Sequence, residues 1–168
     1  MYTFTFPTGS IVQILGYSSP HCGVVIDEHR IIELIAIKNE QIQQMFCKLV
    51  LLDFSTLDKH PLTQEAPSYK LRQKSSFPWT KEQLKERIKA LRPKYEDREY
   101  HIIYKNCQHF AWELATGEAK SPNADHLSVV GGPIGLIFKI KDFGSTSSSI
   151  SLTDLMPFQS NLRDFLLL

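Results

Sequence analysis

Two short apolar runs that follow closely on one another constrain this fold more than any other feature of the chain. Residues 22–26 and 31–35 are rich in valine and isoleucine, and if Ile26 pairs with Arg30 the loop between them is the three residues 27–29. Such a short connection between β-rich runs predicts an antiparallel hairpin. The length of the connection also predicts the register, in which Gly23 lies opposite Glu33.

Further strands and two helices are predicted from the hydrophobic pattern. Additional strands are expected at three places: residues 11–15, 48–52 and 101–104. A helix is expected to begin near Thr80, which forms a capping box with Gln83, and to end at Pro93. A second helix covers residues 107–116 and ends at Gly117.

The rest of the chain carries weaker patterns. Residues 53–78 are rich in Pro, Ser, Thr, Gln and Lys, which favours a long surface loop or insertion. We expect a main domain over residues 1–121, variable at 38–78, and an apolar and serine-rich extension over 122–168. Within that extension, residues 127–140 are apolar but contain Gly-Gly-Pro, so they are too short and too broken to span a membrane. They are expected to complete the core or to contact a membrane surface.

Charge and cysteine content exclude several classes of protein. The chain has 19 Lys and Arg against 18 Asp and Glu, which gives no electrostatic reason to expect nucleic acid binding. Its three cysteines, Cys22, Cys47 and Cys107, form no CxxC pair, so neither a disulfide framework nor a zinc site is predicted. Free thiols and the lack of a signal-peptide pattern predict a cytoplasmic protein, with membrane association left open.

Cys107 occupies a position that favours a reactive thiolate. It is expected in the first turn of the second helix, directly after Asn106, which is a good N-cap residue. The unpaired N–H groups and the positive dipole end of that turn both favour the thiolate, which is the nucleophilic form of cysteine. The alternative is that Cys107 is a small apolar residue on the buried face of the helix.

His21 and Glu33 come together if the hairpin has the predicted register. Side chains alternate along a strand, so both residues then lie on one face of the sheet as diagonal neighbours, roughly 7–8 Å apart between Cα atoms. A carboxylate at that place can hold the imidazole in one tautomer and stabilise its charged form. With a two-residue loop, Glu33 would lie on the opposite face. The alternatives are an edge-strand histidine and a carboxylate that faces solvent.

The remaining cysteines and histidines have no predicted chemistry. Cys22 alternates away from His21 and is interpreted as a core residue, while Cys47 is interpreted as structural. His109 points about 200° away from Cys107 around the helix, because successive residues are about 100° apart. The histidines without a predicted partner are His29, His60, His101 and His126.

Taken together, these residues resemble the lecithin retinol acyltransferase family, the H-box/NC group of the NlpC/P60 superfamily. The resemblance covers about residues 7–121 and is carried by the opening Pro-Thr-Gly-Ser-Ile-Val, the H-box His-x-Gly-Val-Val-Ile that begins at His21, and the Asn-Cys-Gln-His-Phe block that begins at Asn106. It implies a circularly permuted papain-like α+β fold. In that fold an antiparallel sheet packs against the nucleophile helix, and the histidine strand precedes the cysteine helix.

The resemblance also implies an activity without metal or other cofactor. Cys107 would be the nucleophile and His21 the general base. Glu33 stands where many animal members carry a second histidine, and a carboxylate there can orient His21. Tyr17 and Gln108 are candidates for contacts to the oxyanion or for orienting the site. The implied reaction forms an acyl-thioester from a phospholipid or other lipid ester and passes the acyl group to water or an acceptor.

Two other functions stay open. The first is a cysteine peptidase or amidase, as in NlpC/P60 enzymes or the permuted PPPDE peptidases. The second is a non-enzymatic H-box/NC interaction module, although His21, Glu33 and Cys107 are all present. The expected partners are a lipid or acyl substrate and a membrane surface contacted through residues 127–140, without nucleic acid.

Overall fold

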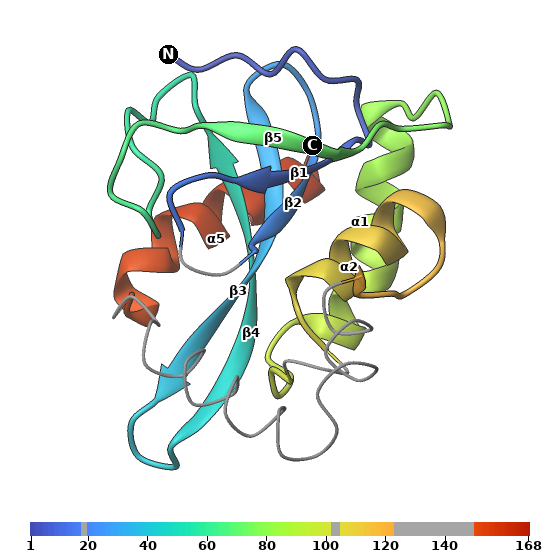
Figure 1. Ribbon diagram of the computed structural model, residues 1–168. Helices are drawn as coiled ribbons and strands as arrows, with labels where there is room; N and C mark the ends of the chain where they lie inside the picture. The colour runs from blue at the N-terminus through green and yellow to red at the C-terminus, as the bar shows by residue number, and fades with distance from the viewer. Residues whose placement is uncertain (18–19, 102–104, 123–149) are drawn as a thin grey trace.

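The structure is a computed structural model that describes residues 1–17, 20–101, 105–122 and 150–168. Its centre is a five-stranded antiparallel sheet (Figure 1). The strands are β1 (Ile11–Ile14), β2 (Cys22–Val25), β3 (Arg30–Asn39), β4 (Gln44–Asp53) and β5 (Tyr69–Gln73). They lie in the order β4-β3-β2-β1-β5, so β4 and β5 are the edge strands. The predicted α+β class with an antiparallel sheet is confirmed.

The predicted hairpin has the predicted register. β2 pairs with β3 so that Gly23 lies opposite Glu33. The connection is held by Asp27, whose Oδ1 accepts hydrogen bonds from the backbone N–H groups of His29 at 3.2 Å and Arg30 at 3.0 Å. The side chain of an aspartate at a tight turn thus satisfies backbone donors that the strands leave unpaired.

The interpretation of residues 53–78 as a loop is wrong at Tyr69–Gln73, which form β5 and pair with β1. As an edge strand, β5 needs no continuous apolar face: Tyr69 is buried, while Lys70 and Leu71 are exposed. β3 and β4 are also longer than the predicted strands at 31–35 and 48–52, since their pairs continue to Asn39 and Gln44.

Both predicted helices begin at their predicted caps. Helix α1 (Lys81–Tyr95) has the capping box, in which the Gln83 N–H donates to the Thr80 hydroxyl and Gln83 Oε1 accepts from the Thr80 N–H. Helix α2 (Cys107–Thr116) ends at Gly117, whose φ of 87° lies in the left-handed region that glycine adopts without strain.

Pro93 does not end α1, contrary to the prediction, because the helix continues for two residues to Tyr95. Tertiary contacts hold this last turn. The Tyr95 ring packs edge-on against Phe110 of α2 at 5.3 Å between centroids, and its hydroxyl donates to Glu113 at 2.5 Å. These contacts offset the hydrogen bond that the proline nitrogen cannot make.

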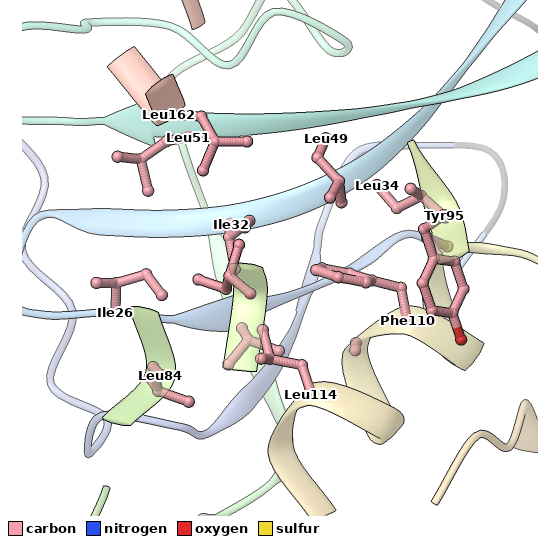
Figure 2. Close-up of a cluster of buried hydrophobic side chains, with 14 of the residues drawn as sticks. Ile26, Ile32, Leu34, Leu49, Leu51, Leu84, Tyr95, Phe110, Leu114 and Leu162 are labelled. Atoms are coloured by element: carbon pink, nitrogen blue, oxygen red, sulfur yellow. The ribbon is translucent and has the colours of Figure 1, made fainter. Parts of the chain in front are cut away.

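The sheet has a cluster of buried apolar side chains on each face. On one face, residues such as Ile32 and Leu34 pack against Leu84 of α1 and Phe110 and Leu114 of α2 (Figure 2). Figure 1 shows α1 and α2 together on this side of the sheet. On the other face, alternate residues of the same strands pack beneath the N-terminal segment and the loop before β5; this cluster includes Phe4, Val25, Ile31, Phe54 and Tyr69.

A further helix, α5 (Leu152–Leu167), packs along the edge strand β4. It buries Leu155, Leu162, Phe165 and Leu166. Glu96 joins the two elements, because its carboxylate accepts from the Leu49 N–H at 3.3 Å and from the Gln159 amide at 3.0 Å. Helix α5 therefore covers part of a sheet edge that would otherwise expose unpaired backbone groups.

Two predicted segments lie largely or wholly outside the described residues. They are the apolar stretch 127–140 and most of the brief strand at 101–104, of which His101 makes a single antiparallel bridge to Lys105. Within the described ranges, no helix has both the length and the apolar character needed to cross a membrane.

Candidate active site

Cys107 lies at the start of α2, beside the residues that lead into β2. As predicted, Asn106 is the N-cap: its side-chain oxygen accepts from the N–H groups of Gln108 at 2.9 Å and His109 at 3.1 Å. Cys107 is 5% exposed, and its thiol donates a hydrogen bond to the Pro20 carbonyl oxygen at 3.8 Å. The helix N-terminus therefore presents this sulfur to the end of the histidine strand.

The surroundings of Cys107 favour the thiolate. Burial acts to raise its pKa, but the charge of the His21 imidazole, a hydrogen bond with that ring and one from the Cys22 backbone outweigh burial. The pKa of Cys107 is therefore lowered from its ordinary value, which increases the fraction of nucleophilic thiolate near neutral pH.

His21 lies between the thiol and a carboxylate. Its Nε2 is 2.8 Å from Oε2 of Glu33, so the two side chains that the register predicted as neighbours are in direct contact. Burial acts to lower the pKa of His21, but the charges of Glu33 and Cys107 and hydrogen bonds to both raise it well above its ordinary value. A lowered thiol pKa beside a raised imidazole pKa favours transfer of the Cys107 proton to His21.

Two further residues contact Glu33 that the sequence did not predict. His60 Nε2 is 3.1 and 3.2 Å from the two carboxylate oxygens, and the Tyr69 hydroxyl donates to Oε1 at 3.0 Å. The available signal was Glu33 itself, which stands between isoleucine and leucine on a buried strand. A carboxylate with 0% exposure needs several hydrogen-bond donors.

These donors keep Glu33 ionised. Burial acts to raise its pKa, but the neighbouring His60 and His21 rings and the hydrogen bonds from both lower it far below its ordinary value. Burial and the neighbouring Glu33 charge raise the pKa of Tyr69 well above its ordinary value, so this phenol stays a donor. The carboxylate is therefore a fixed negative charge behind His21.

The free energy of unfolding contributed by Glu33 should be complete above about pH 4.5. Folding lowers the Glu33 pKa, so this contribution is present above its unfolded pKa, near 4.5, and is lost as the pH falls toward its folded pKa. Folding raises the His21 pKa and lowers that of Cys107, so their contributions change in opposite directions as the pH rises and offset each other on the alkaline side. Urea denaturation from about pH 7 downward measures the Glu33 effect. In Glu33→Gln the decline on the acid side should be smaller, and an unchanged decline would assign it to another group.

Gly23 gives Glu33 the space to reach its partners. A Cβ atom at Gly23 would lie 2.7 Å from Glu33 Cγ and 2.8 Å from the backbone oxygen of Ile32, and the backbone cannot move aside cheaply. Gly23→Ala should therefore lower the free energy of unfolding by about 1–3 kcal/mol, as overpacked sites do, and move Glu33 away from His21. Urea denaturation and the rate of Cys107 alkylation by iodoacetamide measure the two effects. Unchanged stability with unchanged alkylation would contradict this account of the glycine.

The other predicted residues lie near the site in different ways. The Tyr17 ring is edge-on to His21 at 6.0 Å between centroids. Gln108 is buried, and its Oε1 accepts from the Ser121 hydroxyl, which in turn accepts from the Asn106 amide, both at 3.1 Å. This arrangement braces the first turn of α2.

One more tyrosine, which the sequence did not indicate, lies near the thiol. Burial and the charge of Cys107 raise the pKa of Tyr100 well above its ordinary value. The phenol is therefore protonated.

The remaining cysteines and histidines separate from this chemistry. Cys22 and Cys47 are fully buried, and burial raises the pKa of both thiols, that of Cys47 to about 12. His29 hydrogen-bonds the Tyr2 carbonyl oxygen at 3.0 Å, and His126 is outside the described residues. Over the described part of the chain, no three His, Cys, Asp or Glu side chains are grouped to hold a metal ion.

Comparison with known proteins identifies the family. A search of curated proteins finds no match. A family model described as Lecithin retinol acyltransferase matches residues 5–120, more than half of the chain, and the match includes His21, Glu33 and Cys107. The antiparallel α+β fold, with its histidine strand before its cysteine helix, agrees with the permuted papain-like fold of that family. Membership implies an acyltransferase- or phospholipase-like enzyme with a cysteine nucleophile. The chain belongs to the lecithin retinol acyltransferase family.

Proposed function

We propose that this protein is a thiol-dependent acyl hydrolase or acyltransferase that takes its acyl group from a phospholipid or another lipid ester. The observation that carries the proposal is the buried 2.8 Å contact of the His21 imidazole with the Glu33 carboxylate, next to a Cys107 thiol that hydrogen-bonds Pro20, the residue before His21, and whose pKa the His21 charge lowers. Each group in this chain has the pKa shift that a nucleophile, its base and an orienting carboxylate require.

The proposed reaction begins with proton transfer from Cys107 to His21. Because Nε2 of His21 is hydrogen-bonded to Glu33, Nδ1 is the ring nitrogen that faces the thiol in the proposed reaction. The thiolate attacks the ester carbonyl carbon, and the electron pair of the C=O bond moves to oxygen. When the tetrahedral intermediate collapses, the C–O bond to the leaving alcohol breaks and His21 gives that oxygen its proton. The product is an acyl-thioester on Cys107.

The second half of the reaction repeats these steps with water or an acceptor alcohol or amine. His21 takes the proton of the incoming group, which attacks the thioester carbonyl carbon, and the Cys107 thiolate leaves. The developing oxyanion is assigned to the Cys107 N–H at the start of α2, where the helix dipole is favourable. Tyr17 and Gln108 are proposed as nearby contacts to the reacting group, in keeping with their places beside His21 and in the first turn of α2.

A lipid substrate is favoured over a peptide by the family, whose model is described as an acyltransferase. We include in the proposal a peripheral membrane contact through residues 127–140, which rests on the apolar composition of that segment alone. A cysteine peptidase uses the same thiol and imidazole, so the substrate has to be decided by experiment.

The decisive experiment is a search for the acyl-enzyme. The protein is incubated with phospholipid vesicles that carry a labelled acyl chain, and separately with peptide and ubiquitin-like substrates, and is then mapped by mass spectrometry. A labelled acyl group on Cys107 that is absent in Cys107→Ala and retained in Cys47→Ala is the expected result. Peptide cleavage without a lipid adduct would favour the peptidase, and inertness in every arm would favour an interaction module.

A further inference from the structure

We propose that His60 and Tyr69 are positioning residues that hold the Glu33 carboxylate for the reaction. Their role depends on the proposed function only in that Glu33 orients His21 beside a reactive Cys107. The proposal extends the site beyond the hairpin, to the loop before β5 and to β5 itself, which meet at the same carboxylate.

The backbone of the loop fixes the tautomer of His60. Its Nδ1 accepts a hydrogen bond from the Leu62 N–H at 3.1 Å. Since a backbone N–H can only donate, Nδ1 carries no proton, and the ring proton is therefore on Nε2. That nitrogen is 3.1 Å from Oε2 and 3.2 Å from Oε1 of Glu33. His60 is thus a neutral donor aimed at both carboxylate oxygens, and it does not compete with His21 as a base.

Packing holds the His60 ring in place. The residue has 0% exposure, and its ring stacks on Phe54 at 6.3 Å between centroids with an interplanar angle of 30°. Two backbone hydrogen bonds close the loop around it, from the His60 N–H to the Glu65 oxygen and from the Gln64 N–H to the His60 oxygen, both at 2.9 Å. A donor that is fixed in this way loses little conformational freedom when it binds the carboxylate.

Tyr69 supplies the second fixed donor. Its hydroxyl donates to Oε1 of Glu33 at 3.0 Å, on the side of the carboxylate away from the oxygen that meets His21 at 2.8 Å. Tyr69 is the first residue of β5, and its place is set by pairing with Ile14 of β1. With His21, His60 and Tyr69 as donors, Glu33 has partners on both oxygens and cannot rotate without losing at least one of them.

The groups around Glu33 determine how this arrangement affects the thiol. The titratable side chains that face the carboxylate are His21 before β2, His60 in the loop and Tyr69 of β5; Cys107 lies beyond His21, and Tyr2 lies near Tyr69. Without the donors from the loop and from β5, the carboxylate is less firmly ionised and less well aimed. The imidazolium then loses stabilisation, and so does the thiolate that it pairs with.

The test is the pH dependence of Cys107 alkylation by iodoacetamide, followed by mass spectrometry, in variants that separate the donor from the ring. His60→Phe keeps an aromatic ring and removes the donor, whereas His60→Gln keeps an N–H near the Nε2 position. Both variants lose the nitrogen that accepts from the Leu62 N–H, so any loss of stability from that bond is common to the two. We expect the alkylation midpoint of His60→Phe to rise by about 1 pH unit, or about tenfold slower alkylation below the midpoint. His60→Gln should stay within about threefold of the wild type, a loss of under 1 kcal/mol.

Two further variants keep the result interpretable. Tyr69→Phe should raise the midpoint by less than His60→Phe, and it decides the question if His60→Phe fails to fold in a thermal denaturation control. Leu62→Ala loosens the packing of the same loop but keeps the backbone N–H, so it should lower the melting temperature without moving the midpoint. A folded His60→Phe with the wild-type midpoint, an unshifted Tyr69→Phe, or a Leu62→Ala shift equal to that of His60→Phe would each overturn the proposal.

This readout separates the inference from the proposed function. Alkylation needs no substrate, so a midpoint that shifts as expected in a protein without acyl transfer would defeat the function and leave the positioning role intact. If acyl transfer occurs in the wild type and the midpoint is indifferent to both donors, the function stands and the positioning role fails.

Discussion

Replacing Cys107 with alanine should lower the rate of acyl transfer or hydrolysis by roughly 10⁴- to 10⁶-fold, as loss of a catalytic nucleophile does. The methyl group of alanine can form no thioester, so the first step of the proposed reaction disappears. The loss of stability should be modest, because only one sulfur atom is removed from this buried residue. Release of a labelled fatty acid or its transfer to an acceptor, under single-turnover conditions, measures the rate.

Cys47→Ala is the matched control for this change. Cys47 is also a buried free thiol, but burial raises its pKa to about 12 and it packs in the apolar cluster on the α2 side of the sheet. Its variant should keep the wild-type rate with some loss of stability. Equal rates in wild type and Cys107→Ala would remove the nucleophile from the proposal, and equal losses in both variants would indicate a folding defect.

The contact between His21 and Glu33 could be predicted because it is determined by a short stretch of sequence around the hairpin. The three-residue loop 27–29 placed Gly23 opposite Glu33, and the alternation of side chains along a strand then put Glu33 on the face of His21. The structure has this register and a distance of 2.8 Å between the two side chains. Loop length and strand period are properties of a short stretch of sequence, and they are enough to set such a pair.

The donors on the far side of Glu33 could not be predicted, because they are distant in sequence. His60 is 27 residues from Glu33 and Tyr69 is 36 residues from it. Tyr69 reaches it only when β5 pairs with β1, and the polar composition of an edge strand conceals that pairing. No periodicity in residues 53–78 marks which of its side chains point inward, so a buried carboxylate was the single sign that more donors were needed.

The arrangement of Cys107 and His21 could be predicted only in part. The local sequence predicts the N-cap at Asn106, and with it the place of the thiol on its own helix. Nothing local predicts that this helix end meets the residues before β2, which are 87 residues away at Pro20. The family resemblance supplied that contact. Similarly, tertiary packing of Tyr95 overrode the helix-ending preference of Pro93.

Glu33→Gln should lower the rate of acyl transfer by roughly 10³- to 10⁴-fold, although it changes one atom, because it reverses the hydrogen-bond pattern behind His21. The amide nitrogen of glutamine donates, so a ring nitrogen facing it must accept; His21 then carries its proton on Nδ1 and cannot take one from Cys107. The buried donors of His60 and Tyr69 also lose an ionised acceptor, so the free energy of unfolding should fall by about 3–5 kcal/mol, the usual cost of breaking a buried pair. Glu28→Gln is the control, since it makes the same chemical change on a side chain that is 73% exposed and should alter neither quantity. Rates and urea midpoints measured together distinguish the two effects, and a folded Glu33→Gln with the wild-type rate would show that the reaction does not depend on a carboxylate behind His21.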